Sequence, residues 1–90
     1  MPSDSETPDL QRAVALLEDG DWQAAHAIVQ KDEESVLACW AHGIVHLMEG
    51  DLPNARYWYR AASREFPEAP SVAAEISALK SSIGMGRAKK

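Results

Sequence analysis

The segment at residues 43–67 reads GIVHLMEGDLPNARYWYRAASREFP, and it decides the fold. At its centre, Gly50 can take the left-handed conformation that ends a helix, and Asp51 can cap the helix that follows. The pattern therefore predicts one helix over residues 35–49 and a second from residue 52 to about residue 65. Because the connection between them is short, we expect the two helices to pack antiparallel to each other.

The earlier of these two helices has almost no polar face. Its apolar residues are Val36, Leu37, Ala38, Cys39, Trp40, Ala41, Ile44, Val45, Leu47 and Met48. A helix that is apolar on every side has to be buried on every side. We therefore expect this helix to form the centre of the hydrophobic core.

Capping residues and glycine stops predict three more helices. With these residues included, the helices run from Thr7 to Gly20, from Asp21 to about Lys31 and from Ser71 to Gly84. No strand is expected, and connections of about two to five residues predict that each helix packs against the next. The sequence therefore predicts an all-α domain over residues 7–83, with a disordered N-terminus (residues 1–6) and a flexible basic tail (residues 84–90).

Composition and charge exclude several classes of protein. The longest run without a charged residue or histidine, residues 35–41, is far shorter than the roughly 20 residues of a membrane span. Eleven acidic and two basic residues lie in residues 1–55, against three acidic and seven basic residues in residues 56–90, for a net charge of −5. Nucleic-acid binding is not expected, because it normally requires a basic domain. The lone Cys39 and the lack of a readable secretory signal predict a cytoplasmic protein.

The spacing of small and aromatic residues is typical of a helical repeat. The helix-ending glycines at positions 20, 50 and 84 are 30 and 34 residues apart. The repeat positions are held by Gly43, Gly50, Asp51, Ala55, Tyr59, Ala62 and Pro67. This arrangement resembles the tetratricopeptide repeat, and the chain as a whole is similar to small bacterial tetratricopeptide-like proteins. The resemblance implies antiparallel helical hairpins in a right-handed superhelix of about two and a half repeats, capped by the last helix.

The same resemblance implies an interaction scaffold, in which the first helix of each repeat lines a concave groove for a peptide or protein partner. Carried over by position, the groove is lined by Leu10, Val14, Leu17, Leu37, Trp40, Ile44, Leu47 and Met48. Because this lining is apolar, it has to be covered by the last helix, by a second copy of the chain or by a partner segment. The alternative is that these side chains are core residues of the monomer.

Three arginines are spaced four residues apart and predict a basic stripe on one helix face: Arg56, Arg60 and Arg64. Such a stripe can bind an acidic segment or a phosphate group, because guanidinium groups bind oxyanions through paired hydrogen bonds. The acidic first half of a second copy is one candidate partner, which predicts a salt-sensitive homodimer. The alternative is a solvated face with ion pairs between neighbouring turns.

A second candidate site centres on histidine. His42, His46 and Glu49 share one helix face at spacing i, i+4, i+7, which is a common arrangement of zinc ligands, and His26 on the preceding helix is a further candidate. Two alternatives remain beside this metal site. One is a pocket for a small polar ligand, with an enzymatic role left open.

The other alternative is structural and needs no cofactor. In it, the histidines hydrogen-bond to neighbouring polar residues and hold two helices in register; the candidate partners are Glu49, Asp51, Asn54 and Tyr57. The spacing HGIVH lacks the glutamate of a metalloprotease motif, and no nucleophile motif is present. Of the two functions, the sequence favours the interaction scaffold over the ligand-binding or metal-binding domain.

Overall fold

All regular structure in the part of the chain that the computed structural model describes, residues 6–83, is α-helical. The helices are α1 (Glu6–Glu18), α2 (Trp22–Val29), α3 (Val36–Glu49), α4 (Leu52–Ala61) and α5 (Val72–Ser82). The predicted all-α class is therefore confirmed. Thr7, expected to cap the first helix, lies inside α1 instead. The predictions for residues 1–5 and 84–90 lie outside the described residues.

Three of the predicted capping residues, Asp21, Asp51 and Ser71, are confirmed, and Ser35, which the sequence pattern placed inside its helix, is a fourth cap. A side-chain oxygen accepts a hydrogen bond from the backbone N–H three residues later at Asp21, Ser35, Asp51 and Ser71. Gly20 and Gly50 adopt φ angles of 84° and 87°, in the left-handed region. Local chemistry therefore defines where these helices begin and where α1 and α3 end.

The helix α4 ends four residues earlier than the sequence pattern suggests. Ser63 follows its end with a φ angle of 59°, and the Arg64 N–H donates to the carbonyl oxygen of Tyr59 at 2.9 Å. A serine thus adopts the left-handed conformation that Gly50 adopts after α3. The early end leaves residues 62–71 as the connection to α5, which is longer than expected.

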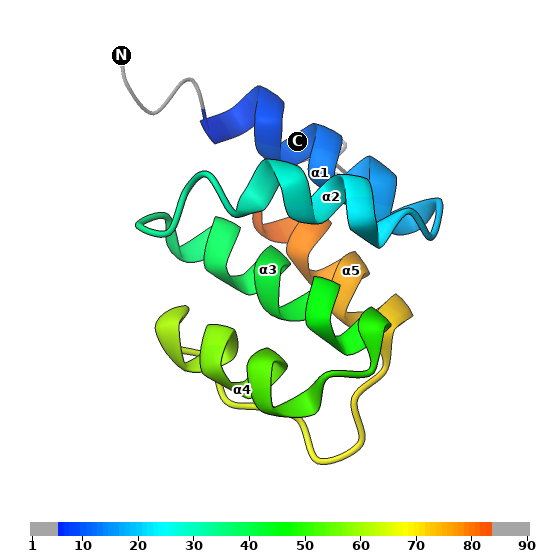
Figure 1. Cartoon of the computed structure of the whole chain (residues 1–90), viewed down its shortest axis with the longest axis vertical. Coiled ribbons are helices and arrows are strands. Elements are labelled where there is room, and N and C mark those ends of the chain that lie inside the picture. The colour runs from blue at the N-terminus through cyan, green and yellow to red at the C-terminus, as the bar shows by residue number, and fades with distance from the viewer. Residues whose placement is uncertain (1–5, 84–90) are drawn as a thin grey trace.

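The helix α3 occupies the centre of the molecule, where it contacts all four other helices (Figure 1). Every residue from 38 to 45 is buried. The largest fully buried side chains are Trp40, Tyr59, Leu17, Ile44, Leu79, Val14, Val29 and Val45. The prediction that this helix forms the centre of the core is confirmed. None of the described helices combines the length and hydrophobicity that crossing a membrane requires.

Consecutive helices run in opposite directions from α1 to α4, and among the described helices only α3 has its backbone close to that of α4 (Figure 1). At the α3–α4 contact, a Cβ atom added to Gly43 would lie 2.5 Å from Cδ1 of Tyr59 and 3.3 Å from the carbonyl oxygen of Ala55. The expected close approach of these two helices is confirmed. It is possible only because residue 43 has no side chain.

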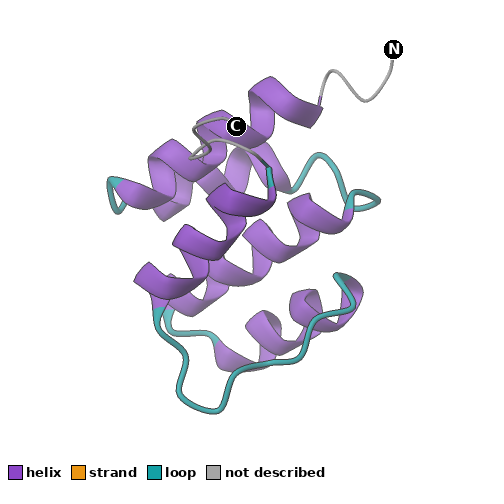
Figure 2. Cartoon of the chain, turned by 180° about the vertical axis from the view of Figure 1, so that it is seen from behind, coloured by secondary structure: helices purple, strands orange, loops and turns teal. Residues whose placement is uncertain are grey.

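The helix α5 does not pack on α4, which corrects the expectation that each helix packs against the next. It lies across α1 and α3 instead, in front of them in Figure 2. The backbones of α4 and α5 stay apart, and the hydrogen bond from the Tyr59 hydroxyl to Glu75 links the two helices through their side chains. The connection of residues 62–71 is long enough for the chain to reach α1 and α3 before α5 begins. The helix α5 then buries Ile76 and Leu79 in the hydrophobic core that it shares with α1 and α3. One side of both α1 and α3 is therefore covered by the chain itself.

Polar contacts join α5 to the rest of the core. Trp40 Nε1 donates to Glu75 Oε1 at 3.1 Å, and the Tyr59 hydroxyl donates to the same oxygen. At the other side of α5, Lys80 Nζ lies 2.7 Å from Glu18 Oε2 on α1. These contacts satisfy buried donors of α3 and α4 with a carboxylate from α5, which helps to orient α5 on the core.

Candidate functional site

The three histidines of the chain come together at the contact between α2 and α3. One ring nitrogen from each of His26, His42 and His46 lies within 4.8 Å of the others. The ring centroids are 4.8 Å apart for His26 and His42, 5.5 Å for His26 and His46, and 5.2 Å for His42 and His46. We call these three residues the histidine cluster.

Helix geometry explains this convergence. His42 and His46 are four residues apart and therefore share one face of α3. Along α2, Ala25 and Val29 are buried, so the helix turns this side toward the core. His26 directly follows Ala25, is half-buried, and reaches the histidine face of α3.

His42 is the buried member of the cluster, with only 4% of its surface exposed. Its ring stacks on Trp58 of α4, with centroids 3.9 Å apart and an interplanar angle of 8°. Burial, followed by the nearby His26 and His46, lowers the pKa of His42 to about 4. The ring is therefore neutral near pH 7, which is the form that binds metal ions.

The Nδ1 atom of His42 is a buried polar atom without a hydrogen-bond partner within residues 6–83. Buried polar atoms in native proteins almost always have a partner, and an exception calls for an ion or a water molecule. This atom does not fit the structural alternative, in which neighbouring side chains satisfy both histidines. That alternative holds for His46 alone, whose Nδ1 lies 2.8 Å from Glu49 Oε1.

The structure divides the metal ligands predicted from the sequence between two groups of side chains spaced closely enough to hold a metal ion: His26, His42 and His46 in one, and His46, Glu49 and Asp51 in the other. Glu49 contacts His46 and groups with Asp51, whereas His26 takes the third position beside His42. The reason is spacing along the helix: Glu49 is seven residues beyond His42, about two turns away, and α2 brings His26 closer. A carboxylate bound to the far nitrogen of a ligating histidine orients that ring, so Glu49 retains a supporting role.

Asn54 and Tyr57 lie outside the histidine cluster, which corrects their predicted place in it. Asn54 Nδ2 donates to Asp51 Oδ2 at 2.7 Å, and this hydrogen bond lowers the pKa of Asp51. Tyr57 is 61% exposed and its ring meets Trp58 edge-on. Sequence reasoning missed the role of Trp58, because three consecutive aromatic residues left open which of them faces α3.

The cluster is close to the geometry of a three-histidine metal site. Zinc binds histidine nitrogens at about 2.0–2.1 Å, so ligand nitrogens of a tetrahedral site are about 3.4 Å apart. The present separations, up to 4.8 Å, require ring movements of roughly 1 Å to reach that value. His42 is buried and held by Trp58, so His26 and His46, which are less buried, would make most of this movement. Three nitrogen ligands leave a fourth coordination position for water or another ligand.

The predicted apolar groove is not open in this structure. Five of the eight residues assigned to it are buried within the chain, namely Leu10, Val14, Leu17, Trp40 and Ile44. The other three, Leu37, Leu47 and Met48, are partly buried and pack against the core. Since α5 covers α1 and α3, the expectation of a concave binding face is corrected in favour of the alternative, a core within the monomer.

The three predicted arginines lie at one hollow but not on one helix. Arg56 and Arg60 belong to α4, whereas Arg64 follows its early end. All three are exposed and line the hollow together with Ser63, Glu65 and Phe66. No ion pair joins them to a carboxylate within residues 6–83, so the arginines are exposed as in the alternative of a solvated face, but without its ion pairs between neighbouring turns.

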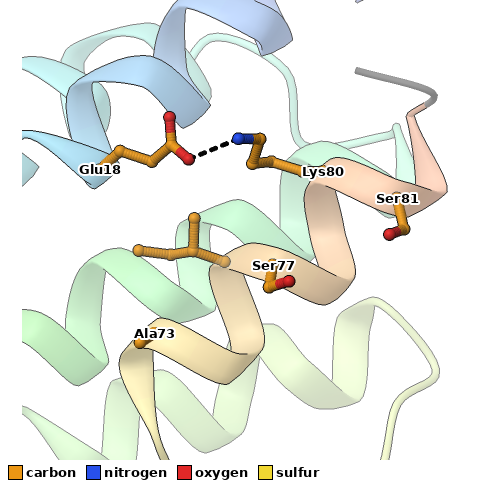
Figure 3. A pocket seen from close by; sticks show the side chains of 6 residues that line it. Glu18, Ala73, Ser77, Lys80 and Ser81 are labelled. Carbon is orange, nitrogen blue, oxygen red and sulfur yellow. Dashed lines mark hydrogen bonds and ion pairs between the residues drawn. The ribbon is translucent and has the colours of Figure 1, made fainter. Parts of the chain in front are cut away.

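A larger hollow, about 500 Å³, lies between α1 and α5 (Figure 3). Its charged lining residues are Glu18 and Lys80, which pair across it. The remaining lining consists of Ala73, Ile76, Ser77 and Ser81. Because its two charges neutralise each other, this hollow offers little to a charged ligand, and it contains none of the residues predicted for a site.

Comparison with known proteins gives no indication of function, so the candidate sites rest on the histidine cluster and the three arginines. No protein-family model, curated protein or solved structure matches this chain.

Proposed function

We propose that this protein binds a transition-metal ion, zinc being the first candidate, through His26, His42 and His46. Two observations on one residue carry the proposal: His42 contributes a ring nitrogen to a cluster in which the nitrogens are no more than 4.8 Å apart, and its buried Nδ1 has no hydrogen-bond partner within residues 6–83. A metal ion bound by the cluster accounts for the convergence of all three histidines of the chain.

The surroundings of the cluster suit such an ion. Neutral imidazoles bind Zn²⁺, Cu²⁺ and Ni²⁺ in preference to Mg²⁺ or Ca²⁺, which take oxygen ligands. The stack on Trp58 holds the ring of His42, and the contact with Glu49 orients that of His46. Because three protein ligands leave one position open, the site can also bind a small ligand through the metal.

We also infer that α1–α2 and α3–α4 are arranged as tetratricopeptide-like hairpins in a right-handed sense. The close approach of Gly43 to Tyr59 at the repeat positions supports this arrangement. The buried, free thiol of Cys39 supports a cytoplasmic location. Tetratricopeptide scaffolds bind peptides on the side that α5 covers in this protein. A protein partner would therefore bind to the exposed face of α4 instead.

The direct test is metal content and affinity of the untagged protein, because a histidine tag would itself bind metal. We expect one zinc ion per chain by elemental mass spectrometry after size-exclusion chromatography. His26→Gln removes a half-buried ligand with little effect on the core, and it should weaken zinc binding at least ~10-fold in competition with a chromophoric chelator. Gln30→Ala, an exposed change at the end of the same helix, serves as the matched control.

The supporting contact gives a second, graded test. Glu49→Gln should weaken zinc affinity by ~10-fold to 100-fold, because it removes the charge that orients His46. Circular dichroism confirms that each variant is folded. A folded protein that takes up no metal, or that binds zinc equally well with and without His26, would refute the proposed function.

A further inference from the structure

Three positively charged groups surround one hollow at the exposed face of α4 and of the segment that follows it. Arg56, Arg60 and Arg64 line this hollow of about 380 Å³, and we call the three residues the arginine patch. The guanidinium carbon of Arg64 lies 3.5 Å from the ring centroid of Trp40, and that of Arg56 lies 5.1 Å from the ring centroid of Phe66. These cation–π contacts restrict two of the three side chains before any partner binds.

The arginine patch has unused binding capacity. Each guanidinium carries five N–H donors, and within residues 6–83 no carboxylate lies within ion-pair distance of any of the three. No other described helix covers this face, because only α3 has its backbone close to that of α4. Tyr57, 61% exposed, lines an adjoining hollow with Arg56 and Arg60. Exposed tyrosine beside arginine is the typical composition of an energetically important interface.

An acidic counterpart lies in the connection between α2 and α3. Asp32 Oδ1 accepts hydrogen bonds from the backbone N–H groups of Glu34 and Ser35, at 3.1 and 3.0 Å. The Cys39 thiol donates to the carbonyl oxygen of Glu33 at 3.4 Å. The backbone of this segment is thereby held in place. Its two glutamates are exposed, and their carboxylates form no ion pair within the described chain.

The acidic segment and the arginine patch lie at the same end of the molecule. Because α3 and α4 run in opposite directions and are joined at Gly50, the start of α3 and the end of α4 share one end (Figure 1). Glu33 and Glu34 precede α3, whereas Arg60 and Arg64 lie at the end of α4. One end of the protein thus presents both signs of charge, and neither set has an ion-pair partner within residues 6–83.

We propose that two copies of this chain bind each other at this end as a two-fold symmetric dimer. Glu33 and Glu34 of each copy pair with Arg60 and Arg64 of the other. A two-fold interface requires a self-complementary surface, and a surface with both signs of charge at one end meets that requirement. The charge distribution of the whole chain, acidic in residues 1–55 and basic in residues 56–90, favours the same pairing.

A second copy is a better occupant of the arginine patch than nucleic acid. The net charge of −5 repels a polyphosphate chain, whereas the exposed glutamates of the same protein are present at equal concentration and carry the matching charge. This inference is independent of the histidine cluster. The dimer is therefore expected in protein treated with a chelator as well as in zinc-loaded protein.

Paired charge reversals test the inference. Sedimentation equilibrium or light scattering after size exclusion should show a dimer at low salt that dissociates as salt is added. Arg60→Glu should raise the dimer dissociation constant at least ~10-fold, and Glu34→Arg should do the same, because each places like charges opposite each other in both halves of the interface. Arg12→Glu on the exposed side of α1 is the matched control and should leave the dimer intact.

Mixing the two variants gives the decisive result. In a mixed dimer of the Arg60→Glu and Glu34→Arg chains, both halves of the interface again join opposite charges, so dimerisation should return. A protein that stays monomeric at low salt would overturn the inference. So would a dimer that ignores Arg60→Glu, or a mixture of two folded variants that does not associate.

Discussion

Trp40 and Glu75 are joined by a hydrogen bond of 3.1 Å between the indole nitrogen and a carboxylate oxygen. The same oxygen accepts from the hydroxyl of Tyr59, so one carboxylate of α5 serves a buried donor of α3 and another of α4. Burial, followed by the hydrogen bond to Glu75, raises the pKa of Tyr59 well above its ordinary value. The phenol therefore remains a donor throughout the physiological pH range.

Removing this acceptor should cost much of the stability of the domain. Glu75→Ala leaves the donors of Trp40 and Tyr59 without a partner, so we expect the free energy of unfolding to fall by about 2–4 kcal/mol. Glu75→Gln keeps a carbonyl acceptor and should cost less. Urea denaturation at pH 7, followed by circular dichroism, measures both. Equal losses for the two variants would show that the acceptor contributes little.

The close approach of α3 to α4 predicts that residue 43 tolerates no side chain. In Gly43→Ala the new methyl group would lie 2.5 Å from the buried ring of Tyr59. We expect a loss of about 1–3 kcal/mol from overpacking, although alanine favours a helix over glycine by about 1 kcal/mol. Thermal unfolding checks this. An increase in melting temperature would mean that helix propensity outweighs the contact with Tyr59.

The end of α4 offers a stabilising change. Ser63 adopts a φ angle of 59°, which costs a residue with a Cβ atom about 1–2 kcal/mol and costs glycine little. Ser63→Gly should therefore raise the free energy of unfolding by about 0.5–1 kcal/mol. The reverse change, Gly50→Ala at a φ angle of 87°, should lower it by a similar amount. Chemical denaturation of both variants tests the pair, and a gain from Gly50→Ala would contradict the argument.

The histidine cluster predicts a pH-dependent stability for the metal-free protein. The pKa of His42 is about 4 in the folded chain, against an ordinary value of 6.5. As the pH falls below 6.5, the unfolded chain therefore takes up a proton before the native one does. The free energy of unfolding should decrease down to about pH 4, by up to about 3 kcal/mol.

Urea denaturation at a series of pH values, with a chelator present, measures this decrease. His42→Phe keeps an aromatic ring against Trp58 and removes the titrating group, so its pH dependence between 6.5 and 4 should be shallower. The same slope in both proteins would show that other groups, such as the carboxylate of Asp51, whose pKa is lowered by its hydrogen bond to Asn54, cause the acid sensitivity.

Part of the candidate site was predictable and part was not. The i, i+4 spacing of His42 and His46 places both on one face of α3, because helix periodicity alone decides it. The partner of that face depends on how α2 packs, so His26 was only a candidate, and Glu49 groups with His46 and Asp51 rather than with His42. The unpartnered Nδ1 of His42 became visible only with the three-dimensional surroundings.

The sequence by itself determined the helices and the central place of α3, because caps, glycine stops and hydrophobic pattern act between residues a few positions apart. Tertiary structure alone decided that α5 turns away from α4 and closes the apolar side of α1 and α3. It also decided that Glu75 satisfies the indole donor of Trp40. These features depend on contacts between residues distant in the chain, about which a local pattern carries no information. Burial of those contacts selects one arrangement among several that the same helices allow.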